Sequence, residues 1–161
     1  MSIRPFEREI LDRYGSYGKA PDMFTGRKGW KGVWVRGHLR DLHQDYVYNM
    51  YRRWKAFCDQ ALLTEVKIEP GSYDAFRTYF YLLKRLGLVV FYAERKVQPG
   101  EAGSARRFYT LAPGLESDPS WERPFQSVYP ETDWTQLSYR EKHERREKYK
   151  RQRHLAASHN I

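Results

Sequence analysis

The chain has 161 residues, a formal net charge of +9 and an aromatic content of 16%. This length suits one domain with a sizeable core, and the charge favours a polyanionic partner, either nucleic acid or an anionic membrane surface. The single cysteine, Cys58, excludes an intramolecular disulfide and a thiolate metal cluster, and its place in a periodic segment predicts a buried thiol. No apolar run approaches membrane-spanning length and the N-terminus has no signal-peptide core, so we expect a cytoplasmic protein, nucleoid-associated as a further option, with no membrane partner.

The N-terminal part combines one helix with a glycine-rich basic segment. Residues Arg4–Tyr14 have an apolar stripe at helical spacing and end at two glycines. Residues 15–37 interleave glycines with basic and aromatic side chains, a composition that combines phosphate attraction with stacking. The alternative is a surface loop whose tryptophans pack inward. The candidate auxiliary contacts to nucleic acid in this segment are Arg27, Lys28 and Lys31.

The strongest helical periodicity covers His38–Leu62, where apolar residues recur every three or four positions. We expect one continuous helix that acts as a central strut. Core packing explains its stripe, and part of the same face could also form a homodimer contact. The stripe consists of Leu39, Leu42, Tyr46, Met50, Trp54, Phe57 and Ala61.

Residues 71–114 predict a helix, a glycine stop and a two-stranded hairpin. Ser72 can cap the first amides of a helix over residues 72–86, and Gly87 can end it in the left-handed region. Residues 88–92 and 108–111 are short β-branched or aromatic runs that favour strands. The expected apolar face of the helix consists of Phe76, Tyr79, Phe80, Leu83 and Leu86.

The segment YFYLLKRLGLV, followed by RRFYTLAPG, resembles the recognition helix and wing of winged helix-turn-helix proteins, especially MarR- and PadR-like regulators. The resemblance implies an α+β, mainly helical fold, with a winged helix domain over residues 1–114. Residues 62–72, which precede the helix, fit a strand and loop as well as the short helix that the family places there.

The resemblance also implies which side chains meet DNA. In the family, the outward face of the recognition helix enters the major groove, where Arg77 could read a guanine edge. The wing would contact phosphates or the minor groove. The alternative is that these charges only solvate a surface helix and hairpin. The implied DNA-binding residues are Ser72, Tyr73, Asp74, Arg77, Thr78, Tyr81, Lys84, Arg85, Arg95, Lys96, Arg106 and Arg107.

Two further segments follow the hairpin. Residues 115–137 contain several prolines and four spaced aromatics, Trp121, Phe125, Tyr129 and Trp134, which predicts an ordered extended strap pinned to the body. Residues 138–161 predict a basic helix that opens with a capping box and frays after His154. This helix either lies along a phosphate backbone or projects alone into solvent. Its candidate contacts are Arg145, Arg146 and Lys150.

Signals for catalysis are weak. No phosphate-binding loop, zinc-protease or nucleophile-elbow motif occurs. The four residues His38, Asp41, His43 and Asp45 form a poor metal site, because one helix rarely supplies three converging ligands. Pro21-Asp22 with Glu65-Val66-Lys67 faintly resembles the PD…ExK motif of Mg²⁺-dependent nucleases, but a helix separates the two parts. We therefore expect no enzyme, no cofactor and no metal.

These observations favour a DNA-binding transcriptional regulator whose first partner is double-stranded DNA, with RNA as the second choice. The alternative from another class is a structural, RNA-binding component of a ribonucleoprotein or nucleoprotein particle. A metal-dependent nuclease is the remote alternative.

Overall fold

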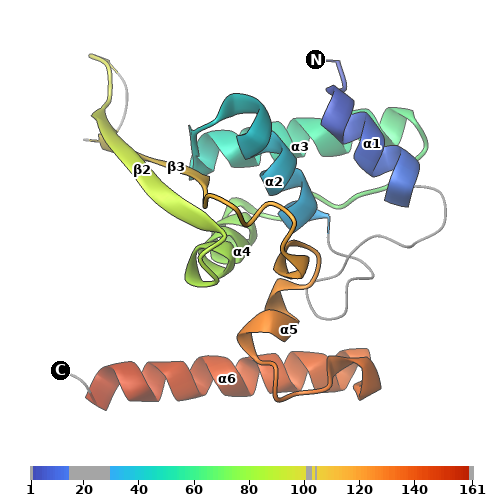
Figure 1. Cartoon of the computed structure of the whole chain (residues 1–161), viewed down its shortest axis with the longest axis vertical. Coiled ribbons are helices and arrows are strands. Elements are labelled where there is room, and N and C mark those ends of the chain that lie inside the picture. Colours follow the sequence, from blue (N-terminus) through green and yellow to red (C-terminus); the bar gives the residue numbers. More distant parts are fainter. Residues whose placement is uncertain (1, 15–29, 101–102, 104, 160–161) are drawn as a thin grey trace.

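The computed structural model of the chain describes residues 2–14, 30–100, 103 and 105–159. Figure 1 shows a helical body from which a long β-ribbon extends to one side, with one long helix beneath it as a separate layer. The architecture is α+β, with one three-stranded antiparallel sheet, as the sequence predicts. The elements are α1 (Pro5–Tyr14), α2 (Lys31–Leu42), β1 (Asp45–Tyr46), α3 (Val47–Leu63), α4 (Tyr73–Arg85), β2 (Val89–Lys96), β3 (Ala105–Leu111), a 3₁₀ turn (Pro119–Trp121), α5 (Pro124–Val128), a second 3₁₀ turn (Trp134–Gln136) and α6 (Tyr139–His159).

The prediction of one helix over His38–Leu62 is wrong, because the chain breaks between α2 and α3. His43 has a φ of 70°, outside the helical region, and its N–H donates to the carbonyl of Leu39. The next residues, Asp45 and Tyr46, form β1 and pair with Tyr109 and Phe108 of β3. The apolar periodicity continues across the break, since Leu39 and Met50 are both buried, and so it conceals the change of direction.

A buried polar network lies at this break. The His38 ring is fully buried, and its Nε2 lies 2.7 Å from Asp45 Oδ2. Asp45 also accepts hydrogen bonds from the Asn49 side chain and the Tyr46 amide. On the other side, Arg4 Nη2 lies 3.0 Å from His38 Nδ1. A buried carboxylate is tolerated only when it is paired and hydrogen-bonded, so this network ties α1, α2 and the start of α3 together.

Stability should depend on pH through His38. Burial lowers the pKa of His38 below its ordinary value of 6.5, although the hydrogen bond to Asp45 favours the charged form. The unfolded chain therefore binds a proton at His38 more readily than the folded chain does. The contribution of His38 to the free energy of unfolding is present above pH 6.5 and is lost as the pH falls from there towards the pKa of the folded state. We expect the free energy of unfolding, measured by urea titration, to fall by up to about 1 kcal/mol from pH 7.5 to 5.5. The decrease should be much smaller in His38→Gln, and an equal decrease in both proteins would contradict this role.

Part of the glycine-rich segment predicted over residues 15–37 is helical, because α2 covers Lys31–Leu42. Residues 15–29 of that segment lie outside the described part. Two glycines of α2 mark close packing, because a Cβ on Gly32 would collide with the Trp121 carbonyl oxygen and one on Gly37 with the Phe6 ring. Trp34 packs inward, as the alternative interpretation held, and donates to Glu7 Oε2 at 2.9 Å.

The helix and hairpin predicted over residues 71–114 are confirmed. Ser72 Oγ accepts the Ala75 amide at 3.1 Å, and Gly87 has a φ of 76°, which ends α4 and turns the chain into the sheet. The sheet order is β1-β3-β2, with a bulge in β2 between Phe91 and Ala93. The strands are longer than predicted, because cross-strand pairing extends beyond the apolar runs as far as Lys96. The residues before α4, 64–72, form neither a helix nor a strand, so only the loop of the strand-and-loop interpretation is found.

The C-terminal segments differ in part from the predictions. Residues 115–137 are not extended: they fold into two 3₁₀ turns and the short helix α5. Trp121, Tyr129 and Trp134 are buried and pin this segment, whereas the side chain of Phe125 lies outside the described part. The capping box of the last helix is confirmed, since the Ser138 hydroxyl and the Glu141 carboxylate each accept the other's amide. The helix continues to His159 rather than ending at His154.

Two smaller expectations concern Cys58 and membrane spans. Cys58 is buried as expected, and burial raises the pKa of its thiol to about 12, so the thiolate form is strongly disfavoured. Among the described residues, none of the helices combines the length and apolar character that crossing a bilayer requires.

Candidate nucleic-acid interface

The outward side of α4 is exposed. Its inward side is buried through Phe76, Phe80 and Leu83. The exposed residues of α4 that the sequence singled out are Asp74, Arg77, Thr78, Tyr81, Lys84 and Arg85. Amphipathic packing therefore presents these polar side chains together, with the Arg77 guanidinium 3.2 Å from the Asp74 carboxylate.

Two predicted contact residues already have structural roles. Ser72 is the N-cap of α4, so its hydroxyl oxygen is used by the Ala75 amide. Tyr73 is half-buried and packs its ring at 5.5 Å from Tyr51 and edge-on at 5.2 Å from Tyr48. Both residues support the position of α4 more directly than they offer a surface for a ligand.

The β2–β3 ribbon carries arginines stacked over aromatic rings. The guanidinium carbon of Arg106 lies 4.6 Å from the centre of the Tyr46 ring, and that of Arg95 lies 4.8 Å from Phe108. On the opposite face of the ribbon, Arg107 lies 5.0 Å from Phe91. A guanidinium group over a ring gains a cation–π attraction and can still donate hydrogen bonds from its edge.

Arg95 and Arg106 are also direct cross-strand partners. Like charges that face each other across a sheet destabilise the pair. Arg95 also donates to Gln44 Oε1 at 2.8 Å. A phosphate oxygen between the two guanidinium groups would lower their mutual repulsion.

A hollow of about 540 Å³ lies between α4 and α6. Four cations from three helices reach it: Lys31 of α2, Arg85 of α4, and Arg146 and Lys150 of α6. Three of these are the auxiliary candidates Lys31, Arg146 and Lys150, which the fold brings together with Arg85 of the expected DNA-binding set. Arg145 is exposed and does not line the hollow, and Arg27 and Lys28 lie outside the described residues.

The ammonium of Lys31 lies in an unusual environment. Burial lowers its pKa below the ordinary value, nearby Cys58 raises it, and nearby Arg146 lowers it. The ammonium also lies 5.9 Å from the centre of the Tyr79 ring. The influence of Arg146 places the two cations, more than a hundred residues apart in sequence, in one electrostatic environment.

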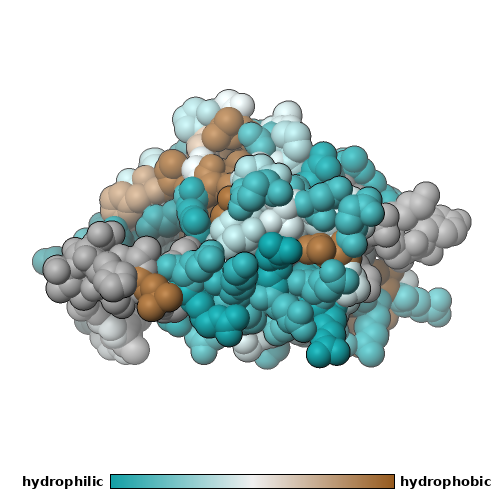
Figure 2. All heavy atoms as spheres, turned by 90° about the horizontal axis from the view of Figure 1, so that it is seen from below, coloured by the Kyte–Doolittle hydropathy of each residue, from teal (hydrophilic) through white to brown (hydrophobic). Residues whose placement is uncertain are grey.

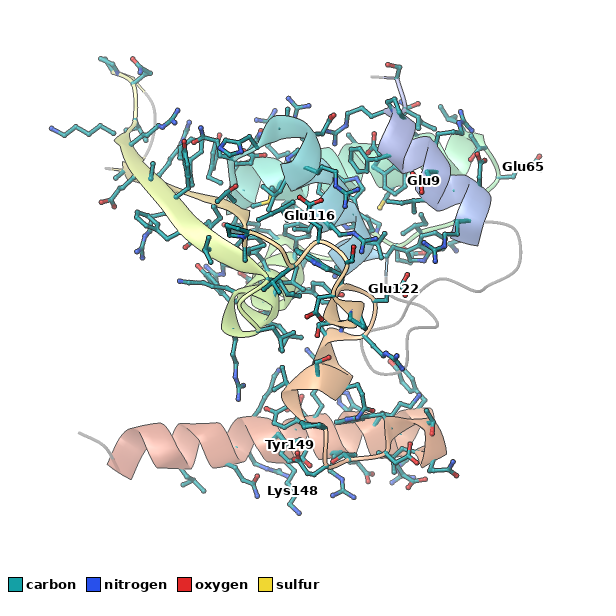
Figure 3. The ribbon with its side chains drawn as sticks, viewed as in Figure 1. Glu9, Glu65, Glu116, Glu122, Lys148 and Tyr149 are labelled. Atoms are coloured by element: carbon teal, nitrogen blue, oxygen red, sulfur yellow. The ribbon has the colours of Figure 1, made fainter. Side chains whose placement is uncertain are left out.

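The weak metal pattern does not assemble in the described residues, and half of the nuclease pattern lies outside them. No group of three or more His, Cys, Asp or Glu side chains that could hold an ion occurs among them. His38 and Asp45 serve the buried network described above. Of the nuclease pattern, Pro21 and Asp22 lie outside the described part, and Glu65 points away from the molecule at the edge opposite the β-ribbon (Figure 3).

Sequence reasoning missed the rings beneath the ribbon arginines. The helical periodicity places Tyr46 in an apolar stripe, and the runs that contain Phe91 and Phe108 predict only strands. The available signal was the two-residue spacing in RRFY, because residues i and i+2 of a strand lie on the same face, so Arg106 lies beside Phe108. Pairing of the strands then brings Arg95 to the same face.

Comparison of the chain with protein-family models, curated proteins and solved structures found no match.

The position of α6 depends on a small aromatic contact. The Tyr149 ring stacks on Tyr129 at 3.9 Å, its hydroxyl lies 2.6 Å from Thr132 Oγ1, and Trp134 packs beside it. The rest of α6 is mostly charged, and the face seen from below is dominated by hydrophilic side chains (Figure 2). Tyr149, labelled in Figure 3, is therefore the main anchor of this helix.

Replacing this anchor should release α6. A stacked aromatic pair contributes about 0.5–1.5 kcal/mol beyond its buried area. In Tyr149→Ala we expect faster amide hydrogen exchange over residues 139–159, with unchanged exchange in α3 and α4. The neighbouring Lys148→Ala is the matched control, because its side chain is exposed. Equal exchange in Tyr149→Ala and the native chain would show that α6 is held by other contacts.

Proposed function

We propose that this protein is a winged helix-turn-helix nucleic-acid-binding protein, with duplex DNA as its first partner and transcriptional regulation as its role. One observation carries the proposal: the elements follow the order α2-β1-α3-α4-β2-β3, and β1 pairs with β3, the second strand of the ribbon. A winged helix domain has this order of elements, with α4 at the position of the recognition helix. The segment between α3 and α4 is longer than the three- or four-residue turn of the simplest helix-turn-helix.

The charge distribution supports a polyanionic partner. Arg95, Arg106 and Arg107 gather on a narrow ribbon, and two of them face each other across the strands. Phosphate oxygens accept hydrogen bonds from guanidinium edges in a planar, bidentate geometry. In this proposal the ribbon supplies affinity through phosphates, while α4 supplies any sequence preference.

The placement of α6 determines which part of α4 a duplex can reach. Thr78, Tyr81 and Arg85 line the hollow that faces α6, whereas Arg77 and Lys84 are exposed and do not line it. Lys84 also lies 5.4 Å from the ring of Tyr109 in β3, which places it next to the ribbon. A duplex would therefore approach along the ribbon and the Arg77–Lys84 side of α4, whereas Thr78 and Tyr81 lie on the side that faces α6.

Binding to duplex DNA should weaken steeply with salt. If four cations of α4 and the ribbon neutralise phosphates, the logarithm of the association constant should fall with that of the salt concentration with a slope of about −3 to −4. Fluorescence anisotropy on one duplex at several salt concentrations measures the slope. A flat response would exclude phosphate contacts as the source of affinity.

Two arginine substitutions distinguish contacts with phosphates from contacts with base edges. Arg106→Gln should weaken all duplexes to a similar degree and reduce the salt slope by about 1, because it removes a phosphate contact. Arg77→Gln should instead reduce the difference in binding free energy between preferred and random duplexes. The expected loss on the preferred duplex is about 1–3 kcal/mol. Arg140→Gln, at an exposed position on α6 that does not line the hollow, is the control. Uniform weakening by Arg77→Gln would argue against base readout.

The exposed rings of the ribbon favour a second candidate, an RNA-binding component of a nucleoprotein particle. Phe91 and Tyr92 are each 46% exposed, and unstacked bases pack well on such rings. Competition between duplex DNA, single strands and structured RNA at one salt concentration distinguishes the two candidates. Stronger competition by RNA, lost in Phe91→Ala, would favour this second function.

A further inference from the structure

The hollow between α4 and α6 gathers basic side chains from three helices. Its lining holds four cations and a single carboxylate, that of Asp74. Asp74 is already engaged by Arg77, which lies outside the hollow. Lys150 lies 3.7 Å from the Glu147 carboxylate, whereas Lys31 and Arg85 form no ion pair within the part of the chain that the structure describes. Like charges gathered in one hollow repel one another, and a bound anion would offset that repulsion.

The cations are held by ordered parts of the fold. Lys31 begins α2 and packs against the Tyr79 ring. The Arg85 guanidinium carbon lies 5.7 Å from the Tyr129 ring, which itself stacks on Tyr149. Arg146 and Lys150 lie one helical turn apart on α6, on either side of the anchored Tyr149 and half-buried. Packing, rather than chance exposure, therefore directs the four side chains to one place.

We infer that this hollow is a binding site for a ligand with clustered phosphate groups, of the size of a nucleoside triphosphate. A volume of about 540 Å³ is within the range of small-molecule sites. A triphosphate chain matches several cations within one small volume, and guanidinium groups bind its oxygens in bidentate geometry. Thr78 and Tyr81, which also line the hollow, add hydroxyl groups and an exposed ring for the rest of the ligand.

Such a ligand would bridge α4 and α6. Arg85 binds it from the core side, while Arg146 and Lys150 bind it from the C-terminal helix. The ligand would then add polar contacts to the aromatic anchor at Tyr149, and would hold α6 over the outward side of α4. This site is separate from the ribbon, so it exists whether or not the protein binds duplex DNA.

Isothermal titration calorimetry of the full chain at fixed, low salt tests the site with two probes, inorganic triphosphate and a nucleoside triphosphate. Both should bind with one-to-one stoichiometry. Arg85→Gln and Lys150→Gln should each weaken binding about tenfold, the loss typical of one charge-assisted contact. Lys148→Gln is the matched control, because it removes the same charge from the same helix at an exposed position drawn on the side away from α4 (Figure 3). It should change the affinity by less than about twofold.

Three results would overturn the inference: no heat of binding from either probe, equal weakening by Lys148→Gln and Lys150→Gln, or binding of long oligonucleotides only. Lys150→Gln provides the test if Arg85→Gln, which also loses the Tyr129 contact, fails to fold. Arg106→Gln should bind triphosphate as the native chain does. Failure to bind DNA would therefore contradict the proposed function, whereas failure to bind triphosphate would contradict only the inferred site in the hollow.

Discussion

The hydrogen bond between His38 and Asp45 is the contact on which the arrangement of this chain depends. Asp45 is buried, and a carboxylate in that position must be satisfied by donors from more than one segment. His38, Asn49 and the Tyr46 amide supply them only when the chain leaves the helical path after Leu42. The same departure extends Tyr46 against Phe108, so the ribbon is attached to the body at the point where the helix breaks.

Cations and aromatic rings recur together on both basic surfaces. On the ribbon, arginines lie over Tyr46, Phe91 and Phe108, and at the hollow Arg85 lies over Tyr129. A ring lowers the freedom of a long basic side chain and adds a cation–π attraction while it leaves the donor edge accessible. The protein thus presents ordered positive charge on a scaffold in which its aromatic residues support the cations as well as the core.

The α6 helix borders the hollow and is held to the body by a small contact. It is too polar to bury a face of its own, and its contact with the body runs through Tyr149 and the small cluster around Trp134. Because this contact is small, the helix can be displaced at modest cost, whereas an anion shared with α4 would hold it in place. One side of α4 therefore faces a helix that begins more than fifty residues further along the chain.

The sequence by itself determined the α+β class, the cap, stripe and glycine stop of α4, the two ribbon strands and the basic last helix, because each depends on neighbouring residues and on periodicity. It also identified Arg77 and Arg107 as polar positions, and both are exposed. Only the tertiary structure decided the break after α2, the close packing of Gly32 on Trp121 and the meeting of Lys31, Arg85 and Arg146. These depend on contacts between residues far apart in sequence, and a local pattern carries no information about which distant side chain will satisfy a buried carboxylate, fill the space over a glycine or share a charged hollow.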